Sequence, residues 1–148
     1  MDDLQFDFPA RRQEFSPTAA VARDEDVTLS APVFLIVEDD WLLRQAIAEV
    51  IGGAGWNVLE AESGETAVAL LRSGERIDAL ITDVRLSGQM SGWDLAETFR
   101  ASNPKLPVVY VSGNPIIEVR RVAGGQFLPK PCDLQKLINV CELLLLSG

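Results

Sequence analysis

Short apolar runs, each ending at a charged or hydroxyl residue, recur along this chain between residues 33 and 130. The runs, each with the polar residue that follows it, are Val33-Phe34-Leu35-Ile36-Val37 before Glu38, Ala79-Leu80-Ile81-Thr82 before Asp83, Val108-Val109-Tyr110-Val111 before Ser112, and Phe127-Leu128-Pro129 before Lys130. Apolar runs of this length between amphipathic segments are typical of buried parallel strands. Ligands of such sheets bind beyond the carboxyl ends of the strands. The pattern therefore predicts one pocket where carboxylates, a hydroxyl and an ammonium group converge.

Amphipathic segments between these runs predict helices that alternate with the strands. The expected helices are 40–51, 64–72, from near Ser91 to before Pro104, and from Asp133 to near the end, with a further strand at 56–59. Gly52, Gly53 and Gly55 are expected to end the first helix, Ser63 to cap the second, and Ser91 with Asp94 to form a capping box. We therefore expect an α/β fold, a doubly wound five-stranded parallel sheet of flavodoxin-like order 2-1-3-4-5.

Composition restricts the cellular compartment and the kinds of partner that we expect for this protein. The 148 residues suffice for one good hydrophobic core. The net charge of −9 and pI of about 4.4 argue against nucleic acid or an anionic membrane surface as a direct partner. Met1-Asp2-Asp3 is unlike a secretory signal, no apolar run approaches the length of a membrane span, and Cys132 and Cys141 lack the spacing of a zinc site. We expect a cytoplasmic protein.

The order and spacing of the polar residues resemble the receiver domain of two-component response regulators over about residues 32–147. The matching residues are the acidic pair Glu38-Asp39, then Asp83, Ser112 and Lys130-Pro131. The resemblance implies that Asp83 accepts a phosphoryl group and that Ser112 and Lys130 contact it. An aspartate can act as a carboxylate nucleophile. Phosphoryl transfer otherwise needs positioning and neutralisation of charge, which an ammonium group and a hydroxyl supply.

The same resemblance implies a metal site and a switch residue. Mg²⁺ would be held by Glu38, Asp39, Asp83 and the backbone carbonyl of Arg85, because this hard cation prefers oxygen ligands. Phe127, three residues before Lys130, matches an aromatic switch position, and the bond from Lys130 to the proline after it is expected to be cis.

Each of these residues also has a purely structural interpretation. Asp39 or Asp40 could cap a helix, Asp83 could begin a turn, Lys130 could be solvated, and Phe127 could be an ordinary core residue. Taken together, the matches favour the phosphorylation site.

Two segments depart from the family pattern. The loop after Asp83 is longer than usual and has Ser87 where proline is typical. The interval from Ser112 to Lys130 is shorter than in typical receivers and contains Pro115, Gly124 and Gly125. We therefore expect the fourth helix of the fold to be short, irregular or absent.

Residues 1–31 differ in kind from the receiver domain expected at 32–148. They combine prolines and acidic residues with Phe6, Phe8 and Phe15, without a helical or alternating period, which predicts an extended or partly disordered extension. The last helix has an unusually wide apolar arc, which includes Val140, Leu143, Leu144 and Leu146. We expect a second subunit, in a homodimer, or residues 1–31 to cover it.

These features predict a stand-alone receiver. Because the chain contains no histidine, its phosphoryl donor must be another molecule, a sensor histidine kinase or a histidine phosphotransfer protein. It would signal by contact with a downstream protein or serve as a phosphate shuttle or sink, and its only catalysis would be phosphorylation and dephosphorylation of its own aspartate.

One alternative is a pseudo-receiver that binds partners without phosphorylation. The other is a small aspartyl-phosphate phosphatase, disfavoured because Arg85 stands where haloacid-dehalogenase-like enzymes carry a second aspartate. A nucleotide-binding module is disfavoured because the turn after the first strand is acidic and lacks a glycine-rich cradle.

Overall fold

A computed structural model describes residues 31–113 and 120–147 of the chain. Its five strands are all parallel: β2 (Val33–Val37), β3 (Asn57–Ala61), β4 (Ala79–Asp83), β5 (Val108–Ser112) and β6 (Gln126–Pro129). They lie in the order β3-β2-β4-β5-β6, which is the predicted order 2-1-3-4-5. The carboxyl ends of β2 and β4, and of β4 and β5, are therefore neighbours at one edge of the sheet.

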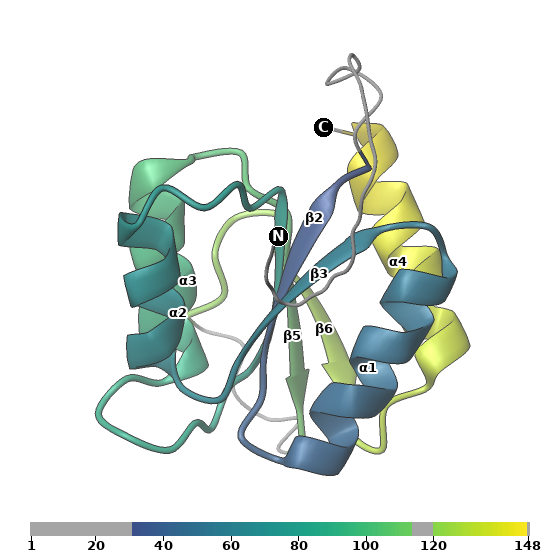
Figure 1. The fold of residues 1–148 in the computed structure, drawn as a ribbon, viewed down its shortest axis with the longest axis horizontal. Coiled ribbons are helices and arrows are strands. Elements are labelled where there is room, and N and C mark those ends of the chain that lie inside the picture. Colours follow the sequence, from purple (N-terminus) through teal and green to yellow (C-terminus); the bar gives the residue numbers. More distant parts are fainter. Residues whose placement is uncertain (1–30, 114–119, 148) are drawn as a thin grey trace, which may run out of the picture. The chain divides into compact units, whose positions relative to one another are not determined.

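Helices cover both faces of this sheet (Figure 1). The helices are α1 (Trp41–Gly53), α2 (Gly64–Arg72), α3 (Gly92–Ser102) and α4 (Leu134–Ser147). Helices α1 and α4 pack on one face, around a core that includes Phe34, Ile36 and Ile81. Helices α2 and α3 pack on the other, around Leu35, Leu80 and Tyr110. Because alternate residues of each strand face opposite sides, both faces of these strands must be apolar, and the doubly wound fold is confirmed.

Local hydrogen bonds set where the helices begin. The Ser63 side chain caps α2 by accepting from the Thr66 amide, and Ser91 and Asp94 form the predicted capping box of α3. Asp40 caps α1 and accepts from the Leu42 and Leu43 amides. The structural interpretation of Asp40 was therefore the right one, and its carboxylate is directed to the helix.

Two predicted boundaries were wrong by a few residues. Helix α1 continues through Gly53, and the chain turns at Gly55, whose φ of 91° is in the left-handed region. The strand predicted at 56–59 lies at Asn57–Ala61, because Asn57 pairs with Val33 in the parallel register. Trp56 instead stacks on Phe34, with ring centroids 4.9 Å apart.

The connection from β5 to β6 contains turns and no helix at residues 113 and 120–125, in agreement with the expected shortening of the fourth helix. Pro115 lies outside the described residues, as do residues 1–30 with their predicted extension. Arg120 anchors the far end of the connection by pairing with Asp94 and Glu97 of α3, while the Val122 amide donates to the Tyr110 hydroxyl at 3.0 Å. Among the described residues, none of the helices has the length and apolarity needed to cross a bilayer.

Candidate phosphorylation and metal site

The predicted site residues meet at the carboxyl edge of the sheet. Asp83 is the last residue of β4 and Ser112 the last of β5, while Glu38 directly follows β2. These three side chains are almost completely enclosed, with exposures of 6%, 2% and 2% in that order. An open pocket of about 350 Å³ lies beside Asp83 and Ser112 and is lined by these two residues together with Arg85, Gly113 and Lys130. The parallel register thus brings together residues that are far apart in the chain.

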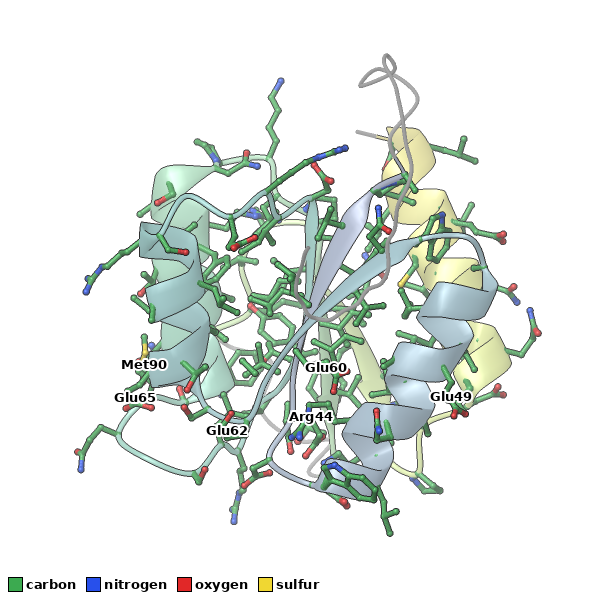
Figure 2. All side chains as sticks on the ribbon, viewed as in Figure 1. Arg44, Glu49, Glu60, Glu62, Glu65 and Met90 are labelled. Carbon is green, nitrogen blue, oxygen red and sulfur yellow. The ribbon has the colours of Figure 1, made fainter. Side chains whose placement is uncertain are left out.

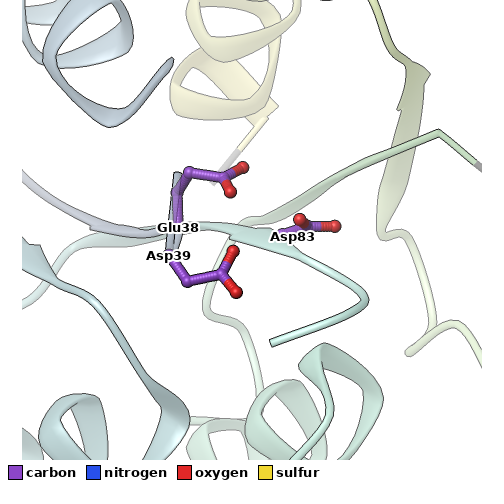
Figure 3. Close-up of side chains that lie close together, drawn as sticks. All are labelled: Glu38, Asp39 and Asp83. Carbon is purple, nitrogen blue, oxygen red and sulfur yellow. The ribbon is translucent and has the colours of Figure 1, made fainter. Parts of the chain in front are cut away.

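Three carboxylates form a cluster that can hold a cation. One oxygen from each of Glu38, Asp39 and Asp83 lies within 4.8 Å of the other two. Figure 3 shows these side chains where β2 and β4 end. Asp39 is exposed whereas the other two are buried, so the cluster is open to solvent on one side. Carboxylates with an open position suit Mg²⁺, which retains several waters when bound.

Lys130 joins two of these carboxylates. Its Nζ donates a hydrogen bond of 2.8 Å to Asp83 Oδ2 and lies 3.1 Å from Glu38 Oε1. Burial lowers the pKa of Lys130, but the hydrogen bond to Asp83 and the negative charge of the nearby Glu38 outweigh it and raise the pKa above its usual value. The interpretation of Lys130 as a merely solvated side chain was therefore wrong. The Lys130–Pro131 bond is cis, as predicted.

Glu38 carries an oxygen whose bonding is incomplete. Its Oε2 accepts from the Asp40 amide at 3.0 Å. Its Oε1 is buried and, despite the nearby ammonium, accepts no hydrogen bond of acceptable geometry from the described residues. Burial, reinforced by the charge of Asp83, raises the pKa of Glu38 to about 7. An enclosed acceptor of this kind needs a partner, and a divalent cation coordinated by the cluster would provide it. The residues present therefore fit a metal ion.

The backbone around Asp83 is held in place by its neighbours. The Thr82 hydroxyl donates to the Asp83 carbonyl oxygen at 2.8 Å, and the Arg85 amide donates to Asp83 Oδ1 at 3.2 Å. Gly92 packs so closely on this carbonyl that an added Cβ would overlap its oxygen. Thr82 and Gly92 were not singled out from the sequence, because these contacts depend on where α3 begins relative to β4.

Arg44 is a second residue that the sequence did not indicate. Its Nη1 donates to the Glu38 carbonyl oxygen at 2.7 Å, and its Nε pairs with Glu60 at 3.1 Å. Figure 2 shows Arg44 and Glu60 close together. Arg44 therefore ties the acidic loop after β2 to the end of β3.

Phe127 pairs with Tyr110 across β6 and β5 and packs half-buried against the core beneath α2 and α3. This packing agrees with its interpretation as a core residue, and its switch role stays a prediction.

Beside the site, a second cavity of about 420 Å³ is lined by the loop after β4 together with Trp93 and Ser112.

Comparison with known proteins identifies the family. A model of the response regulator receiver domain matches residues 34–142. The chain is 36% identical over 107 residues to a cyclic di-GMP phosphodiesterase of Thermotoga maritima, covering 70% of this chain and 28% of that protein. It is 30% identical over 115 residues to the probable transcriptional regulatory protein TcrX of Mycobacterium tuberculosis, covering 75% and 48%.

A solved structure extends the match to the fold. The response regulator receiver protein of Sinorhizobium medicae WSM419 shares 32% identity at a TM-score of 0.76, covering 79% of this chain and 96% of that one. The chain spans less than half the length of the two curated relatives but nearly all of this solved receiver. The protein therefore belongs to the response-regulator receiver family of two-component signalling.

Proposed function

We propose that this protein accepts a phosphoryl group on Asp83 from a histidine kinase or a histidine phosphotransfer protein, in a reaction that depends on Mg²⁺. The observation that carries the proposal is the bridge from Lys130 to both Asp83 and Glu38 beside an open pocket. A nucleophilic carboxylate, an ammonium group and a carboxylate cluster able to hold a metal thus lie together at one edge of the sheet.

In the proposed reaction, an Asp83 carboxylate oxygen attacks the phosphorus of the donor's phosphoimidazole. The new oxygen–phosphorus bond forms as the nitrogen–phosphorus bond breaks, and the imidazole leaves with the electron pair. Lys130 exchanges its bond to Asp83 Oδ2 for one to a phosphoryl oxygen, and the Ser112 hydroxyl donates to another. The one further step on the chain's own aspartate is dephosphorylation, in which water attacks the phosphorus, phosphate leaves and the Asp83 carboxylate is restored.

Glu38, Asp39, Asp83 and the Arg85 backbone carbonyl would hold the metal. Bound Mg²⁺ supplies positive charge that offsets the charge on the phosphoryl oxygens. The chain's own contribution is to orient the carboxylate oxygens that would hold the metal. Arg44 does so by its bond to the Glu38 backbone, and Thr82 by its bond to the Asp83 backbone.

The partners follow from this chemistry. Without a histidine of its own, the chain must receive the phosphoryl group from another molecule. A histidine kinase or phosphotransfer protein would be that donor in the cell, and because such kinases draw on ATP the exchange would take place in the cytoplasm. Phosphorylation would then change a contact with a downstream protein, with Phe127 reporting the state of the site, or the group would pass onward as in a shuttle or sink.

The test is phosphorylation by a small donor such as phosphoramidate with Mg²⁺, followed by intact-protein mass spectrometry. The wild type should gain one phosphoryl group, and Asp83→Asn should gain none, because an amide is nearly isosteric but a poor nucleophile. Asp133→Asn is the matched control. Its exposed side chain accepts from the Lys136 amide, a capping contact that asparagine preserves, so this variant should be phosphorylated like the wild type.

Other outcomes distinguish the alternatives. An equal phosphorylated fraction in the wild type and Asp83→Asn would reject Asp83 as the acceptor. A wild type that binds a partner kinase but never gains the group would indicate a pseudo-receiver. Sustained turnover of a small phosphoester would indicate a phosphatase.

A further inference from the structure

The carboxylate of Glu65, in the first turn of α2, holds a loop that belongs to a different part of the chain. Its Oε2 accepts from the Gln89 amide at 2.9 Å and from the Met90 amide at 3.2 Å. Figure 2 shows Glu65 beside Met90. The pKa of Glu65 lies below its ordinary value, because its carboxylate accepts hydrogen bonds from its own backbone amide and from the amides of Gln89 and Met90. The Gln89 and Met90 amides thus donate charge-assisted hydrogen bonds to an ionised carboxylate, and such bonds are stronger than neutral ones.

The loop is shaped to receive this carboxylate. Gly88 adopts a φ of +92°, and a Cβ added there would lie 2.7 Å from Glu65 Oε1. Ser87 forms an isolated parallel bridge with Ser63, just before α2. A Cβ added at Gly64 would lie 2.7 Å from that of Met90. Three successive residues at the start of α2 therefore touch the segment 87–90.

The other end of the same loop lies at the phosphorylation site. The Arg85 amide donates to Asp83 Oδ1, and Arg85 lines the pocket together with Ser112. The Gly92 amide donates to the Val84 carbonyl at 2.7 Å, which closes the base of the loop where α3 begins. Glu65 thus fixes the outer part of a loop whose inner part carries Arg85.

We propose that Glu65 is a positioning residue for the metal site, acting through the loop 84–90. The proposal rests on the proposed function, because it takes the Arg85 carbonyl as a ligand of Mg²⁺. This loop is longer than in typical receivers and has Ser87 where they have proline. The bonds from the loop to Glu65 supply the order that a proline would otherwise provide. Without them, cation binding must also order the loop, and affinity falls.

The experiment measures Mg²⁺ binding to the full chain by isothermal titration calorimetry, at a temperature where every variant is folded. Glu65→Gln keeps the size of the side chain but removes its charge. It should raise the dissociation constant for Mg²⁺ about 3- to 10-fold, below the effect usual for groups that hold a metal ligand directly. Glu62→Gln is its control, because it removes an exposed charge just before α2 and should leave the constant within about 2-fold, as expected for a screened surface charge.

A second pair of variants separates positioning from general destabilisation. Gly88→Ala adds a methyl group against the Glu65 carboxylate, at a backbone that alanine adopts with strain. Gly74→Ala introduces the same strain at a φ of +86°, where nothing lies within 4 Å of the new atom. Both should lower the melting temperature, but only Gly88→Ala should weaken Mg²⁺ binding. Amide hydrogen exchange of the metal-free protein should show faster exchange at Gln89 and Met90 in Glu65→Gln.

The outcomes distinguish this inference from the proposed function. If the wild type binds Mg²⁺ while Glu65→Gln and Gly88→Ala bind it equally well, the positioning role is wrong and the site stands. If Gly74→Ala lost as much Mg²⁺ affinity as Gly88→Ala, general destabilisation would explain the loss in both variants, and the proposal would be overturned. If the wild type itself binds no Mg²⁺, the proposed metal site fails first.

Discussion

Gly92 is a residue at which a small change would disturb the backbone of Asp83, the proposed phosphoacceptor. It begins α3 directly against the backbone of Asp83, where a Cβ would overlap the carbonyl oxygen and lie 2.9 Å from the carbonyl carbon. Neither partner is a flexible side-chain end, so one of the two backbones has to move. The Thr82 hydroxyl, bonded to the same carbonyl oxygen, resists that movement.

We therefore predict that Gly92→Ala lowers the free energy of unfolding by about 1–3 kcal/mol, the range for overpacking of a tight site. It should also slow phosphorylation by small donors, because Asp83 is displaced. Urea denaturation and the rate of mass increase measure the two effects. Gly53→Ala is the control, since its Cβ meets nothing within 4 Å and alanine in a helix should stabilise by about 0.5–1 kcal/mol. Equal stability of the two variants would contradict the proposed close approach.

At the scale of the secondary structure, α4 is the helix whose apolar side chains are covered only in part by the described residues. Leu137 and Cys141 are buried against the sheet, while Leu143 and Leu146 are 66% and 84% exposed among the described residues. The side chains of this half of the helix can therefore be covered only by something other than the sheet that α4 packs on. The covering of α4 stays a prediction, because residues 1–30 lie outside the described part.

If a second copy covers α4, replacing Leu143 and Leu146 together by lysine should convert dimer to monomer. Lysine near a helix carboxyl end is favourable for the helix itself, so the fold should persist. Sedimentation over a range of concentrations measures the association state. Leu42→Lys, at an equally exposed leucine of α1, is the control and should leave association unchanged. A wild type that is monomeric at every concentration, both with and without residues 1–30, would argue against coverage of α4 by a partner copy or by the extension.

The secondary structure was predictable to the extent that it depends on neighbours in the sequence. The apolar runs of β2, β4 and β5 and the capping box of Ser91 with Asp94 are local patterns, and all were found where predicted. The beginning of β3 was placed wrongly, because the register with Val33 decides it and not the apolar run. The roles of Arg44 and Glu65 were missed for a related reason. Each bonds backbone groups, and nothing in a sequence distinguishes a charged side chain that reaches a distant backbone from one in solvent.

At the scale of the whole molecule, the burial of Glu38 links folding to pH and to metal. Its pKa is raised from 4.5 to about 7 in the folded protein, so the folded state binds the proton more tightly than the unfolded state. The stabilising contribution is complete below about pH 4.5 and is lost as the pH rises through about 7. Mg²⁺ requires the ionised carboxylates, so its effect should grow over the same range.

We predict that the metal-free protein loses up to about 3 kcal/mol of stability between pH 4.5 and pH 8 through Glu38. Glu38→Gln should remove this part of the pH dependence. At pH 8, Mg²⁺ at a hundred times its dissociation constant should stabilise the wild type by about 2.7 kcal/mol, and Asp39→Ala should reduce that gain. Thermal and urea unfolding with and without a chelator measure these effects. Parallel pH profiles for the wild type and Glu38→Gln would show that Glu38 is an ordinary carboxylate.

The bond from Lys130 to Asp83 spans 47 positions of the chain, and this separation has a consequence for protein synthesis. A ribosome releases β2 and β4 well before β6, so a growing chain exposes its acidic residues without the lysine that neutralises them. Lys130 can be held beside Asp83 and Glu38 only after β6 has paired with β5. A chain without β6 therefore lacks one of the groups that the proposed transfer would use. The proposed phosphoryl transfer would therefore become possible only once β6 has joined the sheet beside β5.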